Sequence, residues 1–223
     1  MNEQHGPAAL STALTRNTTR TRARYDRLAP IYDRMEGRAE RRFRPWRELL
    51  WQRAREARVL ELGVGTGKNF PYYPSAADVT AVDLSPKMLE RARQRAARTG
   101  ARVTLQLADA QALPFPDATF DTVVATFVFC SVPDPVLGLR EAYRVLKPGG
   151  QLLLLEHMLS ANRLLRPLMH AANPLVVRLM GANINRETVR NVERAGFKLR
   201  RIDDLMGDIV KLIEAEKPAA MLA

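Results

Sequence analysis

A glycine-rich stretch and two aspartates have the residue types that bind a nucleoside-containing ligand. The segment ELGVGTG covers residues 61–67, and glycines allow the backbone to approach a ligand closely. Asp83 and Asp109 each follow an apolar run further along the chain. A carboxylate in the position of Asp83 can accept hydrogen bonds from ribose hydroxyls. Asp109 is placed to accept one from the amino group of an adenine.

The apolar pattern predicts elements that would bring these residues to one edge of a sheet. Strands are predicted over 58–65, 78–84, 102–109, 120–129 and 151–157, helices over 85–99, 134–147 and 185–195, and a closing hairpin over 197–205 and 207–216. Near-continuous apolar strands joined by helices indicate an α/β fold with a parallel, doubly wound sheet. Thr126 then ends the fourth strand, beside the point where the strand order reverses.

We divide the chain into three segments. Residues 1–20 lack apolar periodicity, so we expect a mobile N-terminus. Residues 21–58 form a basic helical segment, a lid or membrane-binding extension, interrupted near Pro30 and Pro45. Residues 59–217 form the main domain, with a helical cap inserted at 158–184.

The positive charge of the chain lies on both sides of a neutral centre. The net charge is +11, and residues 1–58 and 163–201 each contribute +7, whereas residues 59–162 are neutral. No acidic residue occurs from His157 to Arg186. Two basic blocks of this kind indicate a large anionic partner, either a membrane surface or a nucleic acid.

The order of the motifs ELGVGTG, VDLS, LADA and LKPGG resembles the class I S-adenosylmethionine-dependent methyltransferases. The resemblance covers about residues 22–202 and implies a Rossmann-like, seven-stranded sheet whose last hairpin is antiparallel. It also implies that Glu61 orients the glycine loop, that two glycines contact the methionine part of the cofactor and that Met88 packs near the adenine. The implied cofactor-binding residues are Glu61, Gly63, Gly65, Asp83, Leu84, Met88, Asp109, Ala110 and Thr126.

Three further segments are similar to the soluble bacterial phospholipid N-methyltransferases: GTGKNFPYYP (65–74), the stretch 156–175 and GANINRETV (181–189). Those enzymes methylate phosphatidylethanolamine stepwise to phosphatidylcholine, which makes phosphatidylethanolamine the expected substrate. Related sequences methylate quinones or small thiols, and a quinone or small-molecule methyltransferase is the alternative.

Methyl transfer to an amine needs alignment and a neutral amine more than a strong base. His157, at the tip of the fifth strand, is a candidate acceptor of the amine proton or else a capping residue. Tyr25 and Tyr32 are candidates to hold a methylated ammonium by cation–π attraction, or else to anchor a helix. Arg186 is a candidate donor to the headgroup phosphate.

The arginine-rich segment before residue 53 has the composition of an interfacial helix on anionic lipid. With no signal pattern, no apolar stretch of membrane-spanning length and one cysteine, we expect a cytoplasmic monomer that associates peripherally with the inner face of the membrane. The end of the fourth strand lacks the Asn/Asp-Pro-Pro-Tyr/Phe loop of base-amine methyltransferases, so no nucleic acid is expected. The absence of a Cys/His cluster predicts no metal.

Overall fold

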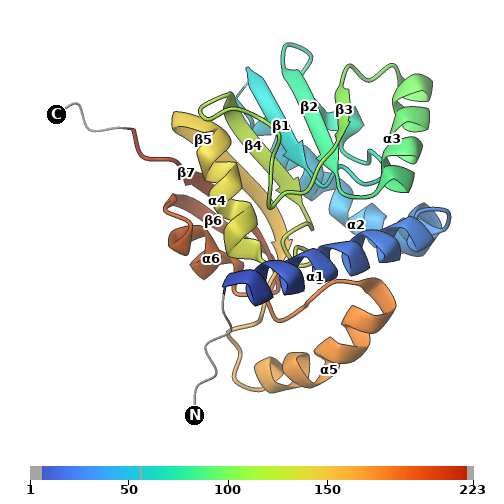
Figure 1. The fold of residues 1–223 in the computed structure, drawn as a ribbon, viewed down its shortest axis with the longest axis vertical. Helices are drawn as coiled ribbons and strands as arrows, with labels where there is room; N and C mark the ends of the chain where they lie inside the picture. Colours follow the sequence, from blue (N-terminus) through green and yellow to red (C-terminus); the bar gives the residue numbers. More distant parts are fainter. Residues whose placement is uncertain (1–6, 56, 220–223) are drawn as a thin grey trace.

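A computed structural model describes residues 7–55 and 57–219 of the chain as a seven-stranded sheet with helices on both faces (Figure 1). The strand order is β3-β2-β1-β4-β5-β7-β6. The pairs from β3 to β5 are parallel, and β7 runs antiparallel to both β5 and β6. The Rossmann-like sheet with a reversed last hairpin is therefore confirmed.

The elements follow one another in the order that the apolar pattern predicts. The strands are β1 Arg58–Leu62, β2 Asp78–Asp83, β3 Thr104–Leu107, β4 Phe120–Thr126, β5 Leu146–His157, β6 Lys198–Met206 and β7 Val210–Glu216. The helices are α1 Pro7–Leu28, α2 Tyr32–Gln52, the short 3-10 helix η1 Phe70–Tyr72, α3 Pro86–Thr99, α4 Pro135–Val145, α5 Leu165–Met180 and α6 Thr188–Arg194.

Alternation along the strands divides the core into two layers. Leu152 and Leu154 of β5 pack with the residues of α4 and α6, whereas Leu153 and Leu155 pack with Leu50 and other residues of α2. All of these leucines are fully buried. Because successive side chains of a strand point to opposite faces, an apolar run of this length requires cover on both sides.

Local signals set the ends of α3. The Ser85 side chain accepts a hydrogen bond from the Met88 backbone N–H, Pro86 occupies the first turn, and Gly100 ends the helix in a left-handed conformation. These are the favoured N-terminal cap, first-turn residue and C-terminal residue of a helix. The carboxyl end of β2, which carries Asp83, is thereby fixed against the start of α3.

The structure differs from the sequence-based expectation in the N-terminal half. Helix α1 runs without a break from Pro7, across the segment boundary that we placed at residue 20; residues 1–6 lie outside the described chain. The helices do separate at Pro30, but Pro45 lies inside α2 and the expected interruption there is wrong. The fully buried Leu50 and the nearly fully buried Trp51 hold the segment after Pro45 against the sheet. Burial of two such side chains offsets the ~3 kcal/mol that an interior proline costs.

Helix α1 crosses the molecule between the sheet and α5 (Figure 1). The two helices meet at Gly181, at the end of α5, where an added Cβ would lie 2.6 Å from Arg24 Cδ of α1. The expected cap at 158–184 therefore contains one helix, and that helix lies beside the N-terminal extension.

The turn after β1 generates a prediction about folding stability. Gly67 has a φ of +81°, and an added Cβ would lie 2.4 Å from the Phe70 ring; Gly100 has a φ of +69° with open space around it. Both Gly67→Ala and Gly100→Ala meet the left-handed penalty of about 1 kcal/mol, but only Gly67→Ala also displaces a buried ring. Chemical denaturation should show a larger loss of unfolding free energy for Gly67→Ala, and equal losses would contradict this assignment.

Candidate active site

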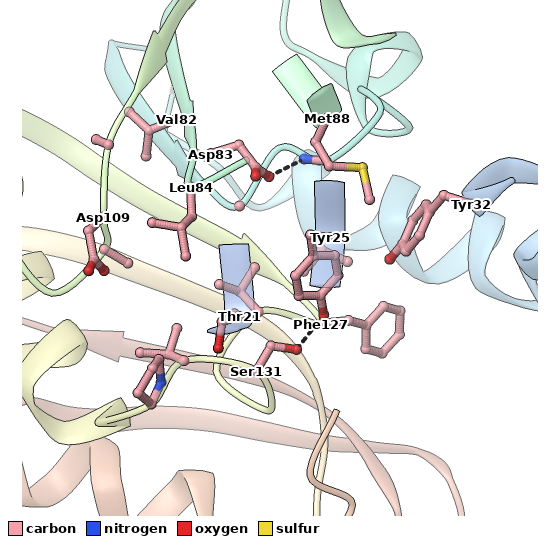
Figure 2. Close-up of a pocket in the computed structure, with 18 residues that line it drawn as sticks. Thr21, Tyr25, Tyr32, Val82, Asp83, Leu84, Met88, Asp109, Phe127 and Ser131 are labelled. Carbon is pink, nitrogen blue, oxygen red and sulfur yellow. Dashed lines mark hydrogen bonds between the residues drawn. The ribbon is translucent and has the colours of Figure 1, made fainter. Parts of the chain in front are cut away.

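A cavity lies at the carboxyl ends of β1, β2 and β4, beneath α1 (Figure 2). Its lining comprises Thr21, Tyr25, Tyr32, Gly63, Gly65, Val82, Asp83, Leu84, Met88, Ala108, Asp109, Ala110, Thr126, Phe127, Val128, Ser131, Val132 and Pro133. The strand order reverses between β1 and β4. Open α/β sheets bind their ligands at this kind of position.

Asp83 forms the acidic centre of the cavity. One of its carboxylate oxygens accepts a hydrogen bond from the Gly65 backbone N–H at 2.8 Å, and the other accepts one from the Ser85 N–H at 2.8 Å. Burial raises the pKa of Asp83 to about 6, although these backbone donors oppose the shift. At neutral pH the group is a carboxylate that can still accept hydrogen bonds from a diol.

The wall formed by α1 is attached to the domain by polar contacts. The Tyr25 hydroxyl and Ser131 Oγ share a hydrogen bond of 2.5 Å, which Figure 2 marks. Ser85 Oγ donates to Asp26 at 2.6 Å, and Thr18 Oγ1 donates to Asp109 at 3.3 Å. The cavity beneath this wall measures about 100 Å³, less than the ~300 Å³ at which small-molecule pockets begin. A ligand of nucleoside size therefore requires α1 or the lining side chains to move.

A buried polar network holds the glycine loop from below. Glu61 is 1% exposed; it accepts a hydrogen bond from Asn69 Nδ2 at 2.5 Å and another from the Tyr73 hydroxyl. Arg47 of α2 donates to Asn69 Oδ1 at 3.0 Å and forms an ion pair with Glu40. Burial raises the pKa of Glu61 to about 7, and its hydrogen bonds oppose that shift.

The start of α2 is bound to the same loop. Thr66 Oγ1 donates to Asp33 at 2.6 Å, and Lys68 forms an ion pair with Glu36. The Lys68 Nζ also lies 5.1 Å from the centre of the Tyr32 ring. These contacts fix Tyr32 at the cavity, where its ring centre is 6.4 Å from that of Tyr25.

Phe127 closes the carboxyl end of β4 in a strained conformation. Its φ of +57° is unusual for a residue other than glycine. Glu156 supports the segment that follows, because its carboxylate accepts hydrogen bonds from the Val128 and Phe129 N–H groups at 2.7 and 2.9 Å. Strain of this kind is retained where the surroundings enforce it, commonly at functional sites.

His157 stacks on Phe127 with ring centres 4.4 Å apart. It does not line the cavity, so the structure places this expected catalytic residue one side chain away from it. Burial lowers the pKa of His157, and the ring is neutral at pH 7. Any effect of His157 on a bound molecule passes through Phe127.

The structure brings together most of the residues predicted from the sequence. Tyr25, Tyr32, Gly63, Gly65, Asp83, Leu84, Met88, Asp109, Ala110 and Thr126 all line the cavity. Glu61 and Arg186 do not line it. Glu61 acts on the loop through Asn69, and Arg186 donates to the Val132 carbonyl at 2.9 Å.

The polar residues that attach α1 were not predicted from the sequence. Gln111 donates from its side chain to Thr18 at 3.1 Å, and Ser131 bonds Tyr25. Single threonines, serines and glutamines carry no periodic signal, and their partners lie about 90 to 106 positions away in the sequence. The position of Ser131 shortly after the end of a strand was the one available indication.

The described residues fit S-adenosylmethionine. Gly65 has open space where a side chain would be, so a ligand could approach its backbone closely, whereas at Gly63 an added Cβ would lie 2.5 Å from Val128. Asp83 would offer a carboxylate to the ribose, and Met88 an apolar surface to the base. When bound, the cofactor supplies a methyl group on a positively charged sulfur. The chain's own part is to bind it, to orient it and to exclude water.

Replacing Asp83 tests the cofactor site. Asp83→Ala removes the ribose acceptor and the support of the Gly65 N–H. A hydrogen bond to a charged group is worth about 1.5–3 kcal/mol, so the dissociation constant for S-adenosylmethionine should rise about 10- to 100-fold by calorimetry. Asp78→Ala, at the other end of β2, is the matched control. Unchanged affinity in Asp83→Ala would remove Asp83 from the site.

Comparison with known proteins agrees with this geometry. The methyltransferase domain family matches residues 60–154. A phosphatidylethanolamine N-methyltransferase of Cereibacter sphaeroides is 44% identical over 106 residues, which is 47% of this chain and 52% of that protein. The match therefore spans about half the length of that relative.

Two further proteins match over more of the chain. A ubiquinone/menaquinone biosynthesis C-methyltransferase of Geotalea daltonii is 31% identical over 167 residues, covering 70% of this chain and 71% of that protein. The crystal structure of a methyltransferase from Thermotoga maritima, described as a possible histamine N-methyltransferase, superposes with a TM-score of 0.66 at 25% identity, covering 88% and 99% of the two chains. With the fold, the site and these relatives in agreement, the chain belongs to the class I S-adenosylmethionine-dependent methyltransferases.

Proposed function

We propose that the chain transfers methyl groups from S-adenosylmethionine to the amine of phosphatidylethanolamine and of its mono- and dimethyl forms, at an anionic membrane surface. The observation that carries this proposal is the aromatic lining of the cavity. Tyr25, Tyr32 and Phe127 all face the space beside the glycine loop (Figure 2). Aromatic faces attract alkylammonium groups, and each successive product retains such a group.

The protonation states of the lining residues indicate that desolvation, and not a strong base, makes the amine neutral. Burial raises the pKa of both tyrosine hydroxyls, so Tyr25 and Tyr32 remain protonated at pH 7. They can donate hydrogen bonds but cannot take the ammonium proton. Removal from water lowers the pKa of an ammonium group, although the Asp83 carboxylate in the same cavity opposes this shift. The methyl acceptor then attacks in line with the methyl–sulfur bond, and alignment supplies most of the acceleration.

The surface of α5 supports an encounter with lipid. Leu164, just before the helix, is 84% exposed, and Leu168 and Leu175 are 63% and 61% exposed. Arg166 and Arg178 lie on the same helix and are also exposed. Exposed leucines among arginines are typical of helices that lie in the interface of an anionic membrane. Within residues 7–55 and 57–219, no helix is long and apolar enough to cross a membrane.

Quinone methylation is the second candidate. The match covers 71% of the quinone-biosynthesis relative but only 52% of the phosphatidylethanolamine N-methyltransferase. A quinone ring could stack against the same aromatic side chains, since stacking does not require a cation.

Methyl transfer to vesicles tests the proposal. Purified protein is incubated with methyl-labelled S-adenosylmethionine and vesicles that contain phosphatidylethanolamine and phosphatidylglycerol, and the lipids are separated by chromatography. We expect label in the mono-, di- and trimethyl lipids. Label in an added demethylated quinone, with none in lipid, would overturn the proposal in favour of the second candidate.

A variant of α5 serves as a control for the membrane part of this experiment. Leu168→Glu places a charge on the exposed apolar surface, so transfer to vesicles should fall while transfer to the same lipid in detergent micelles is retained. Equal transfer to vesicles by the parent chain and Leu168→Glu would contradict a lipid-facing role for α5.

The aromatic lining leads to a separate prediction. Cation–π attraction is worth about 0.5–2 kcal/mol, so Tyr32→Leu should raise the KM for dimethyl-phosphatidylethanolamine about 2- to 30-fold. Tyr32→Phe keeps the aromatic face and should stay close to the parent chain. A KM in Tyr32→Leu equal to that in Tyr32→Phe would show that the ring serves only to anchor α2.

A further inference from the structure

A second cleft, distinct from the cofactor cavity, lies between the start of α4, α5 and the segment that leads into α6. It measures about 640 Å³ and is bordered by Arg140, Arg166, Arg186 and Arg194, together with His170 and Asn185. The loop at 131–134 separates the two spaces, since its first three residues line the cavity and Asp134 lines the cleft.

The acidic residues of the cleft are already engaged. Asp134 caps α4 by accepting hydrogen bonds from the Val136 and Leu137 N–H groups at 3.0 Å. Glu187 accepts from Arg166 at 2.8 Å and from Arg190 at 3.2 Å. Glu187 is thus paired with two other guanidinium groups, while Asp134 is hydrogen-bonded to the backbone and still attracts the Arg186 guanidinium electrostatically.

Three arginines remain without an acidic partner. Across the described ranges, Arg140, Arg186 and Arg194 form no ion pair with a carboxylate. Like charges that border one cleft repel each other, and the repulsion grows as water is excluded. An anion that entered the cleft would reduce this repulsion.

Arg186 has a buried hydrogen-bond donor without a partner among the described residues. One of its terminal nitrogens donates to the Val132 carbonyl, but its buried Nε has no hydrogen-bond partner among the described residues. Burial lowers the pKa of its guanidinium. A buried donor of this kind costs about 1–3 kcal/mol until an acceptor reaches it.

The side chains around the cleft indicate which kind of anion would bind there. Arginine forks match the oxygens of a phosphate group, and Arg140, Arg186 and Arg194 offer donors from three separate elements. On α5, Arg166 and His170 lie on one face of the helix and also border the cleft.

We propose that this cleft is a phosphate-binding site that takes the phosphate of a lipid headgroup or a free phosphate group. The site is separate from the methyl-transfer reaction and does not depend on the substrate proposed above. Binding there would hold the 131–134 loop, and with it Ser131, from the side opposite the cavity.

The test uses the full chain, with inorganic phosphate as the probe at constant ionic strength. Phosphate should raise the Tm in a saturable manner, because it binds only the folded state. The double variant Arg140→Gln/Arg194→Gln should weaken binding by about tenfold or more. Arg98→Gln/Arg102→Gln removes the same charge from exposed positions at the end of α3 and just beyond it, and should leave binding unchanged.

A second arm distinguishes the two sources of phosphate. Short-chain phosphatidylglycerol should bind more tightly than inorganic phosphate if the site takes lipid, and no more tightly if it takes the free group. Either result supports a phosphate site. The absence of a saturable Tm shift, or equal weakening in the two double variants, would overturn it. Methyl transfer measured in parallel separates this outcome from a failure of the proposed lipid methylation.

Discussion

The buried carboxylate of Glu61 is the interaction on which the arrangement of the site depends. It lies on β1, beneath the glycine loop, and accepts hydrogen bonds from Asn69 and Tyr73, which lie just beyond that loop. Through Asn69 it also reaches Arg47, and so α2. A buried acid is costly without partners, so loop and helix must take positions that satisfy it. The same requirement places the backbone of Gly65 within reach of Asp83.

The wall of the cavity formed by α1 is held by polar contacts and not by a buried apolar side chain. Helix α1 meets the cavity through hydroxyl and carboxyl contacts, such as those from Tyr25 to Ser131 and from Asp26 to Ser85. A neutral hydrogen bond contributes about 0.5–1.5 kcal/mol net, and one to a carboxylate about 1.5–3 kcal/mol, because water can replace it. When α1 moves, such contacts can be exchanged for contacts with water, whereas α2 is anchored by the deeply buried Trp51. The site therefore has one side, at α2, that is anchored by apolar packing and another side, at α1, that is held by polar contacts.

The same distinction explains how much the sequence could predict. Strands such as β4 and β5, and the capped helix α3, follow from apolar runs and local cap residues, and the glycine loop with Asp83 follows from its place after β1. The full extent of helix α1 was missed because its contacts are polar and it shows no apolar period. The position of His157 behind Phe127 also could not be foreseen, because it rests on a ring contact between the ends of two strands that no local sequence pattern records.

Under the proposed function, the choice of methyl acceptor depends on residues other than those expected to bind the cofactor at the edge of the sheet. The glycine loop and Asp83 lie within residues 60–154, which the methyltransferase domain family matches, and the relatives of the chain include an N-methyltransferase and a C-methyltransferase. The aromatic lining, to which the proposed function assigns the acceptor, comes from α1, the start of α2 and the strained end of β4. Tyr25 belongs to α1, and Tyr32 belongs to the start of α2 beside it. The elements that close the cavity therefore also supply its aromatic surface. A change in α1 could therefore redirect the enzyme toward a new acceptor without disturbing the network around Glu61.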